Sequence, residues 1–168
     1  MYDLLQHGLS VFLGFFAIMN PIANTAVFVG LTGDMEQGKQ KAIARKALFT
    51  TFIIILVFAL IGNMIFHLFG ITLPALRITG GLLVFLIGYQ MIHGSSAKMH
   101  SSDQDSESDI AISPLAVPIL AGPGTIATAM NYSATGNQTE IIITVTTFAL
   151  LCLFTYFCFI FSEKLINI

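Results

Sequence analysis

Two groups of residues in this sequence combine backbone-breaking and polar side chains inside long apolar runs. The first group is Asn20, Pro21 and Asn24. The second follows Pro118 and consists of Gly122, Pro123, Gly124 and Thr125. Proline cannot donate a backbone hydrogen bond and clashes with the carbonyl four residues earlier, so an apolar helix should break at both places. In a membrane, such breaks are tolerated only beside protein or a water-filled cavity. Both groups are therefore candidates for binding a polar solute.

Asn20 and Asn24 are four residues apart and share one face of a helix. With Asn20 as N-cap and Pro21 in the first helical position, a new half-helix would begin here. Its positive end suits an anionic group such as a carboxylate. The alternative is that Asn20 only caps a kink and that Asn24 bonds to a neighbouring helix.

The second group offers backbone atoms rather than polar side chains. Glycine lets a ligand or another backbone approach closely. In α-helical geometry, Pro118 would free the carbonyl of Pro114, and Pro123 would free the carbonyl of Ile119. A freed carbonyl can accept an ammonium group or coordinate a cation. The alternative is a kinked helix that serves packing alone.

Three further candidates lie in another apolar run. Arg77 is the one charged residue well placed to lie inside a membrane segment, and no acidic residue falls in an apolar core to pair with it. It could contact a substrate carboxylate or form a gate, or it could extend to the membrane interface. Gly80 and Gly81 favour close helix packing and are also included as pathway candidates.

The composition indicates a membrane protein. Of the 168 residues, 55% are hydrophobic and only 10% are charged, and the mean hydropathy is +0.85. A soluble domain has about 25% charged residues. Five apolar segments are each near the ~20 residues that span a bilayer; they cover residues 4–31, 47–69, 74–92, 110–132 and 140–162. We predict an all-α, polytopic membrane helix bundle with five transmembrane helices, of which the first and fourth are broken.

The two broken helices should run in opposite directions, because three crossings separate their starts. This is the arrangement of an inverted repeat, in which paired interrupted helices mark the binding site of a transporter. We assign residues 1–94 to a first three-helix repeat and residues 110–168 to a second, incomplete repeat. The polar, acidic stretch 95–109 between them is predicted to be a cytoplasmic loop.

The basic residues predict the orientation. Five alternating helices place every Lys and Arg except Arg77 on one side, which should be the cytoplasm. The N-terminus is then outside, and the protein is multi-pass.

Other classes of function are not indicated. The sequence has no Ser-His-Asp set, paired carboxylates, HExxH motif or phosphate loop, so we do not expect an enzyme or a cofactor. Cys152 and Cys158 would point to different faces of a helix, so neither a disulfide nor a metal site is expected. No basic patch is present that could bind nucleic acid.

Three stretches together resemble the MarC family of bacterial inner-membrane proteins, also called the NAAT family: Asn20-Pro21 with the residues after it, residues 69–81, and residues 114–124. The resemblance covers nearly the whole chain. It implies a six-helix protein of the inner (plasma) membrane, related to LysE-type exporters, with some members that transport alanine and glycine. A sixth helix is not found before Ile168, so we expect a form that lacks it.

We therefore expect a transporter of small neutral amino acids that works by alternating access. The half-helix ends near Asn20 and at residues 122–124 are expected to hold the substrate carboxylate and ammonium, and Asn20→Ala should abolish transport while leaving membrane insertion intact. A coupling ion and a homo-oligomer are further candidate partners, besides the lipid bilayer. The alternative is a non-transporting or truncated membrane protein with a structural or assembly role.

Overall fold

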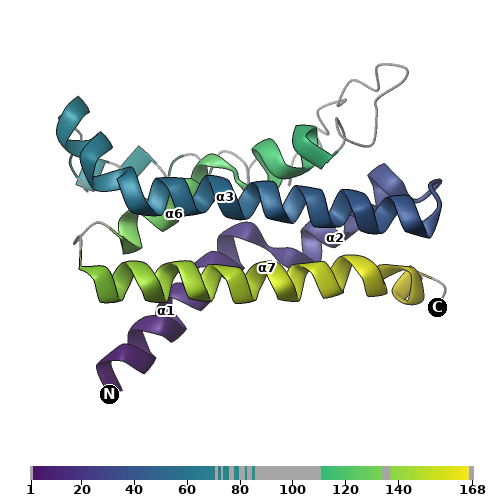
Figure 1. The fold of residues 1–168 in the computed structure, drawn as a ribbon, viewed down its shortest axis with the longest axis horizontal. Coiled ribbons are helices and arrows are strands. Elements are labelled where there is room, and N and C mark those ends of the chain that lie inside the picture. The colour runs from purple at the N-terminus through teal and green to yellow at the C-terminus, as the bar shows by residue number, and fades with distance from the viewer. Residues whose placement is uncertain are drawn as a thin grey trace.

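The structure, a computed structural model, is built from helices throughout the part of the chain that it describes (Figure 1). It describes residues 2–70, 111–133 and 137–166, together with Thr72, Pro74, Ala75, Ile78, Thr79, Leu82 and Phe85. The elements are α1 (Tyr2–Met19), α2 (Pro21–Thr32), α3 (Gln37–Phe69), the π-helix η1 (Ala111–Leu120), α6 (Pro123–Tyr132) and α7 (Gln138–Ile166). The all-α class predicted from the sequence is confirmed for these residues.

Among the residues that the structure describes, three helical stretches are long and apolar enough to cross a membrane. They are Leu5–Thr32 with 28 residues, Gln37–Gly62 with 26 and Gln138–Ser162 with 25. At 1.5 Å per residue, each exceeds the ~30 Å hydrocarbon core. The predicted segment 110–132 corresponds to η1 followed by α6. Most of the predicted segment 74–92 and all of the loop 95–109 lie outside the described residues.

Helix α3 begins at Gln37, whereas the sequence predicted an apolar segment from residue 47. The basic residues Lys39, Lys41, Arg45 and Lys46, which lie between the first two predicted segments, are therefore part of a helix. These residues alternate with Ala and Gln, which have high helix propensity. Ile43 and Ala44, with 1% and 0% of their surface exposed, anchor this turn in the core. A search for apolar runs cannot detect such an amphipathic start, because the basic face lowers its average hydropathy.

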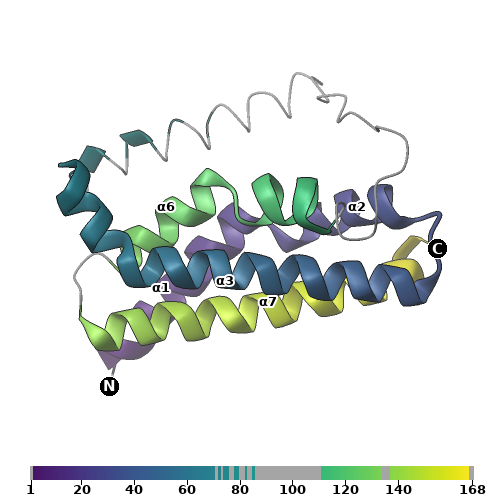
Figure 2. The same ribbon diagram turned by 45° about the horizontal axis from the view of Figure 1, so that its top comes forward.

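The stretches α1–α2, α3, η1–α6 and α7 pack side by side (Figure 2). Along the bundle, α1–α2 and α7 run in one direction, and α3 and η1–α6 run in the other. Helix α7 contacts α1, α2 and α3, and α3 also contacts η1 and α6. In addition, α1 contacts α6, and α2 contacts η1. Because α1 precedes α2 while η1 precedes α6, this pairing makes the two interrupted stretches antiparallel. It also brings the α1–α2 junction to the same level of the bundle as the η1–α6 junction.

Aromatic side chains form the centre of the bundle. The rings of Phe15 and Phe148 join α1 to α7 at a centroid distance of 4.8 Å. The rings of Phe28 and Phe159 join α2 to α7 at 4.4 Å and are nearly parallel, with an interplanar angle of 2°. Large apolar side chains also cover the outer surface, including Leu5, which is 69% exposed, and Phe157, which is 55% exposed. An apolar exterior around a packed core is expected for a chain that faces lipid.

Candidate functional site

The α1–α2 junction depends on the backbone conformation and hydrogen bonds of one residue, Asn20. Asn20 has φ 43° and ψ 73°, a left-handed conformation that asparagine adopts more readily than most other residues. Its N–H donates to the carbonyl of Phe16 over 2.9 Å, which closes α1. Its side-chain oxygen accepts the N–H of Ala23 over 3.2 Å, which caps α2. One residue therefore ends one helix and begins the next, with Pro21 in the first position of α2.

Asn24 also bonds to the backbone of this junction. Its side-chain amide donates to the carbonyl of Met19, the last residue of α1. One turn of α2 is further stabilised by the Thr25 hydroxyl, which donates to the carbonyl of Pro21 over 2.7 Å. The geometry matches the capping alternative for Asn20, and the partner of Asn24 lies in the same stretch rather than on a neighbouring helix. At the N-terminus of α2, the side-chain oxygen of Asn20 thus occupies the position at which we expected a substrate carboxylate.

The η1–α6 junction is built differently. Ala121 donates its N–H to the carbonyl of Ala116 over 2.8 Å, a bond to the fifth preceding residue that is typical of a π-helix. In this register the N–H that Pro118 lacks would pair with the carbonyl of Ser113 rather than with that of Pro114. Pro123 occupies the first position of α6, where its missing N–H would have had no helical partner. The π-helical register therefore differs from the α-helical spacing on which the expected free carbonyls of Pro114 and Ile119 were based.

The N-terminus of α6 has no side-chain cap. Gly122 is the N-cap residue, with an extended backbone at φ −71° and ψ 168°, and no side chain accepts a hydrogen bond there. The first N–H groups of a helix, here those of Gly124 and Thr125, have no partner within the helix. Both residues are buried, and Thr125 is 2% exposed. A helix end with a partial positive charge therefore lies inside the bundle, at the level of the α1–α2 junction.

Two polar features elsewhere in the bundle were not predicted from the sequence. The hydroxyl groups of Thr51 on α3 and Thr144 on α7 are fully buried, and neither has a hydrogen-bond partner among the described residues. In addition, Tyr132 of α6 donates its hydroxyl to the carbonyl of Ser10 on α1 over 3.0 Å. The threonines within these apolar runs are the sequence signal for the first feature. The second joins residues far apart in the chain and has no local signal.

The remaining candidates are only partly described. Arg77, Gly80 and Gly81 lie outside the described residues, and of Pro118 only the backbone position within η1 is described. In the part of the chain that the structure describes, no group of three His, Cys, Asp or Glu residues is close enough to hold a metal ion.

The sequence profile of MarC family integral membrane proteins matches residues 5–168. The chain belongs to the MarC family. It is 37% identical to the UPF0056 membrane protein YvbG of Bacillus subtilis, over 98% of this chain and 82% of that protein. It is 36% identical to the UPF0056 membrane protein PH0760 of Pyrococcus horikoshii, over 86% of this chain and 73% of that protein.

A UPF0056 membrane protein of Buchnera aphidicola is 33% identical over 86% of this chain and 72% of its own length. No solved structure matches the chain. Family membership and the long apolar helices together make this MarC family protein an integral membrane protein.

Proposed function

We propose that this MarC family protein transports small neutral amino acids by alternating access across the bacterial inner membrane. The observation that carries the proposal is the buried, uncapped N-terminus of α6, at Gly122, Gly124 and Thr125. Unpaired N–H groups at a helix N-terminus favour a negatively charged ligand group, and a membrane interior supplies no water to replace it. A substrate carboxylate fits this position.

The residues around the junction favour a small substrate without a charged side chain. Ala121, Gly122 and Gly124 leave room beside the backbone, and no ionisable side chain belongs to this stretch. The C-terminal end of η1 presents carbonyl groups with partial negative charge, which suit the substrate ammonium. Alanine and glycine carry a carboxylate and an ammonium group, and their side chains need little space.

The antiparallel pairing of α1–α2 with η1–α6 supports the alternating-access part of the proposal. In an inverted-repeat transporter, one half rocks against the other around a site at the two broken helices. We include in this proposal an N-terminus outside the cell, a coupling ion, a homo-oligomeric assembly and a gating role for Arg77.

Counterflow of radiolabelled alanine and glycine in proteoliposomes tests the proposal. Thr125→Val removes a buried hydroxyl at the N-terminus of α6 and should lower counterflow at least tenfold, the order expected when one good hydrogen bond to a charged group is lost. Thr128→Val is the matched control. Its hydroxyl donates to the carbonyl of Gly124 over 2.8 Å within the same helix, so this variant should retain counterflow within about twofold.

Absence of saturable counterflow from correctly inserted protein would favour the alternative, a non-transporting membrane protein with a structural or assembly role. Equal losses in the two threonine variants would indicate a general packing defect and would remove α6 from the substrate site.

A further inference from the structure

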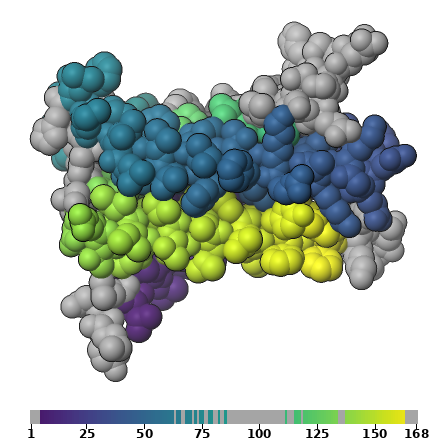
Figure 3. All heavy atoms as spheres, in the orientation of Figure 1, coloured from purple at the N-terminus to yellow at the C-terminus, as the bar shows by residue number. Residues whose placement is uncertain are grey.

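The outer face of the bundle has a groove between α3 and α7. The seam between these two helices faces the viewer along its length in Figure 3. In its middle part a cavity of about 460 Å³ is lined from α3 by Arg45, Phe49 and Phe52, and from α7 by Ala149, Leu153 and Tyr156. Apart from Arg45 and the tip of Tyr156, this lining is apolar.

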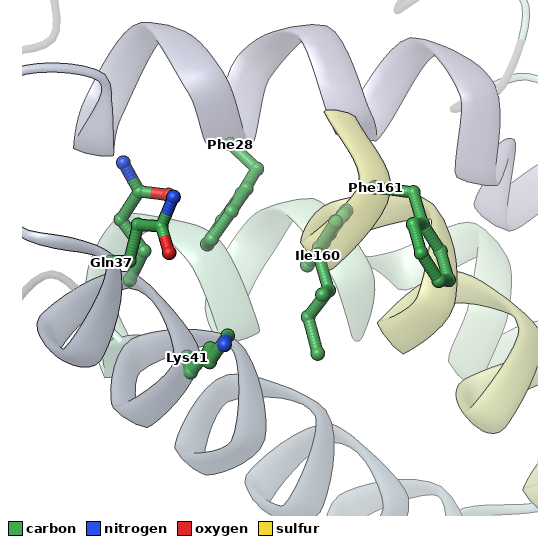
Figure 4. A pocket seen from close by; sticks show the side chains of 7 residues that line it. Phe28, Gln37, Lys41, Ile160 and Phe161 are labelled. Carbon is green, nitrogen blue, oxygen red and sulfur yellow. The ribbon is translucent and has the colours of Figure 1, made fainter. Parts of the chain in front are cut away.

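A second cavity of about 200 Å³ follows along the same seam, towards the start of α3. Figure 4 shows Gln37 and Lys41 of α3 on one side of it and Ile160 and Phe161 of α7 on the other. Gln37, Lys41, Arg45 and Phe49 are spaced four residues apart and therefore share one face of α3. We therefore treat the two cavities as neighbouring parts of one groove. Its basic side chains, Lys41 and Arg45, lie towards the start of α3, and the rest of its lining is mainly apolar.

The charge of the groove is one-sided. Lys41 and Arg45 are exposed. Helix α3 contains no Asp or Glu, and α7 contains none between Glu140 and Glu163. Two basic side chains beside an apolar channel are complementary to a molecule with an anionic head and a hydrocarbon tail.

The length of the groove fits the same kind of molecule. From Lys41 to Phe52 the helical rise is roughly 16 Å at 1.5 Å per residue. One leaflet of the hydrocarbon core is roughly half of 30 Å. An acyl chain anchored by its headgroup at the basic end would therefore lie along the apolar part of the groove.

We propose that the α3–α7 groove is a binding site for an anionic phospholipid, with the phosphate at Lys41 and Arg45 and one acyl chain against Phe49, Phe52, Ala149 and Leu153. This site lies on the outer surface of the bundle. It is independent of the transport site and does not depend on the proposed substrate.

Native mass spectrometry of the purified chain in detergent, titrated with phosphatidylglycerol or phosphatidylcholine, tests the headgroup contact. Phosphatidylglycerol should bind saturably and more tightly than phosphatidylcholine.

Arg45→Gln should weaken the binding of phosphatidylglycerol about fivefold, the effect expected for one basic residue near a lipid surface. Arg45→Lys should retain most of the affinity. Lys46→Gln, an exposed neighbour outside the groove, is the control and should change affinity less than about twofold. Equal binding of the two lipids, or equal losses in Arg45→Gln and Lys46→Gln, would overturn the proposal.

A second pair of variants tests the acyl chain. Ala149→Trp fills the groove and should weaken phosphatidylglycerol at least about tenfold, since each displaced methylene contributes about 0.8 kcal/mol. Leu150→Trp changes a residue that is 57% exposed and lies outside the groove, so lipid binding should persist. If Ala149→Trp leaves lipid affinity unchanged, the groove holds no acyl chain and the proposal fails.

Discussion

At the scale of single residues, Asn20 has the most demanding position in the described structure. Its positive φ disfavours a residue with a Cβ atom, and its side-chain oxygen caps α2. Asparagine meets both demands, because it tolerates the left-handed region and carries an acceptor. The residue therefore stabilises the break in the first spanning stretch, whatever passes beside it.

Substitutions of Asn20 should separate these two demands. Asn20→Ala loses the cap, about 1 kcal/mol, and places an alanine in the left-handed region, at a cost of about 1–2 kcal/mol. Asn20→Gly keeps the backbone relaxed and should lose only a few tenths of a kcal/mol. Thermal unfolding of both variants in detergent, followed by circular dichroism, measures the difference. A larger loss for Gly than for Ala would contradict the assigned conformation.

The sequence predicted the Asn20-Pro21 break but not the partners of the two asparagines. The break depends on proline, whose effect is local and covalent, so sequence is enough to find it. The partner of Asn24 depends on competition between a ligand, another helix and the nearby carbonyl of Met19. The short local contact is present here, and residue spacing alone cannot rank those three alternatives.

At the scale of elements, α1 and α6 approach each other closely where Gly14 faces Tyr132. A Cβ atom on Gly14 would lie 2.7 Å from the Tyr132 hydroxyl oxygen and 3.1 Å from the ring. That hydroxyl also donates to the carbonyl of Ser10. Small residues allow such close helix contacts in membranes, where apolar burial gives little driving force between helices.

Gly14→Ala should therefore destabilise the bundle by about 1–3 kcal/mol, because the tyrosine ring must move and its hydrogen bond is lost. Gly30→Ala is the matched control, since nothing lies within 4 Å of its Cβ position. It should be neutral or more stable by up to about 1 kcal/mol through helix propensity. Unfolding midpoints in detergent test the pair. Similar midpoints for the two variants would mean that the α1–α6 contact is not close.

The sequence predicted which segments are helical better than it predicted the type of each helix and the residue at which it begins. The residues of four predicted segments are helical, because long apolar runs determine the solvent in which they fold. The π-helix of η1 was not predicted, since a shift from the fourth to the fifth preceding carbonyl depends on how η1 packs against α3 and α2. The basic start of α3 was not predicted, because only one of its faces is buried and the other lowers its average hydropathy.

At the scale of the whole molecule, the two ends of the bundle differ in charge. The start of α3 carries Lys39, Lys41, Arg45 and Lys46, and it lies at the same end as the C-terminus (Figure 2). The N-terminus and the start of α7 lie at the opposite end. The positive-inside rule then assigns the α3 start to the cytoplasm.

Single-cysteine labelling tests this orientation. In a background with Cys152 and Cys158 replaced by alanine, Gln138→Cys should react with a membrane-impermeant maleimide in intact spheroplasts. Gly38→Cys should react only after the membrane is permeabilised. Both positions are exposed, so access differs only by side. The reverse pattern would place the N-terminus in the cytoplasm and would contradict the proposed orientation.

The two junctions at the same level of the bundle are unequal, because one is closed by Asn20 and the other has no side-chain cap. A repeat related by a pseudo-two-fold axis would be expected to offer two equivalent half-sites. Here the uncapped helix end belongs to one half only. If the protein is a carrier as proposed, its inward-facing and outward-facing states would therefore differ in chemistry. Affinities for the same solute at the two membrane faces should then differ, and in an uncoupled carrier unequal populations of the two states must balance that difference.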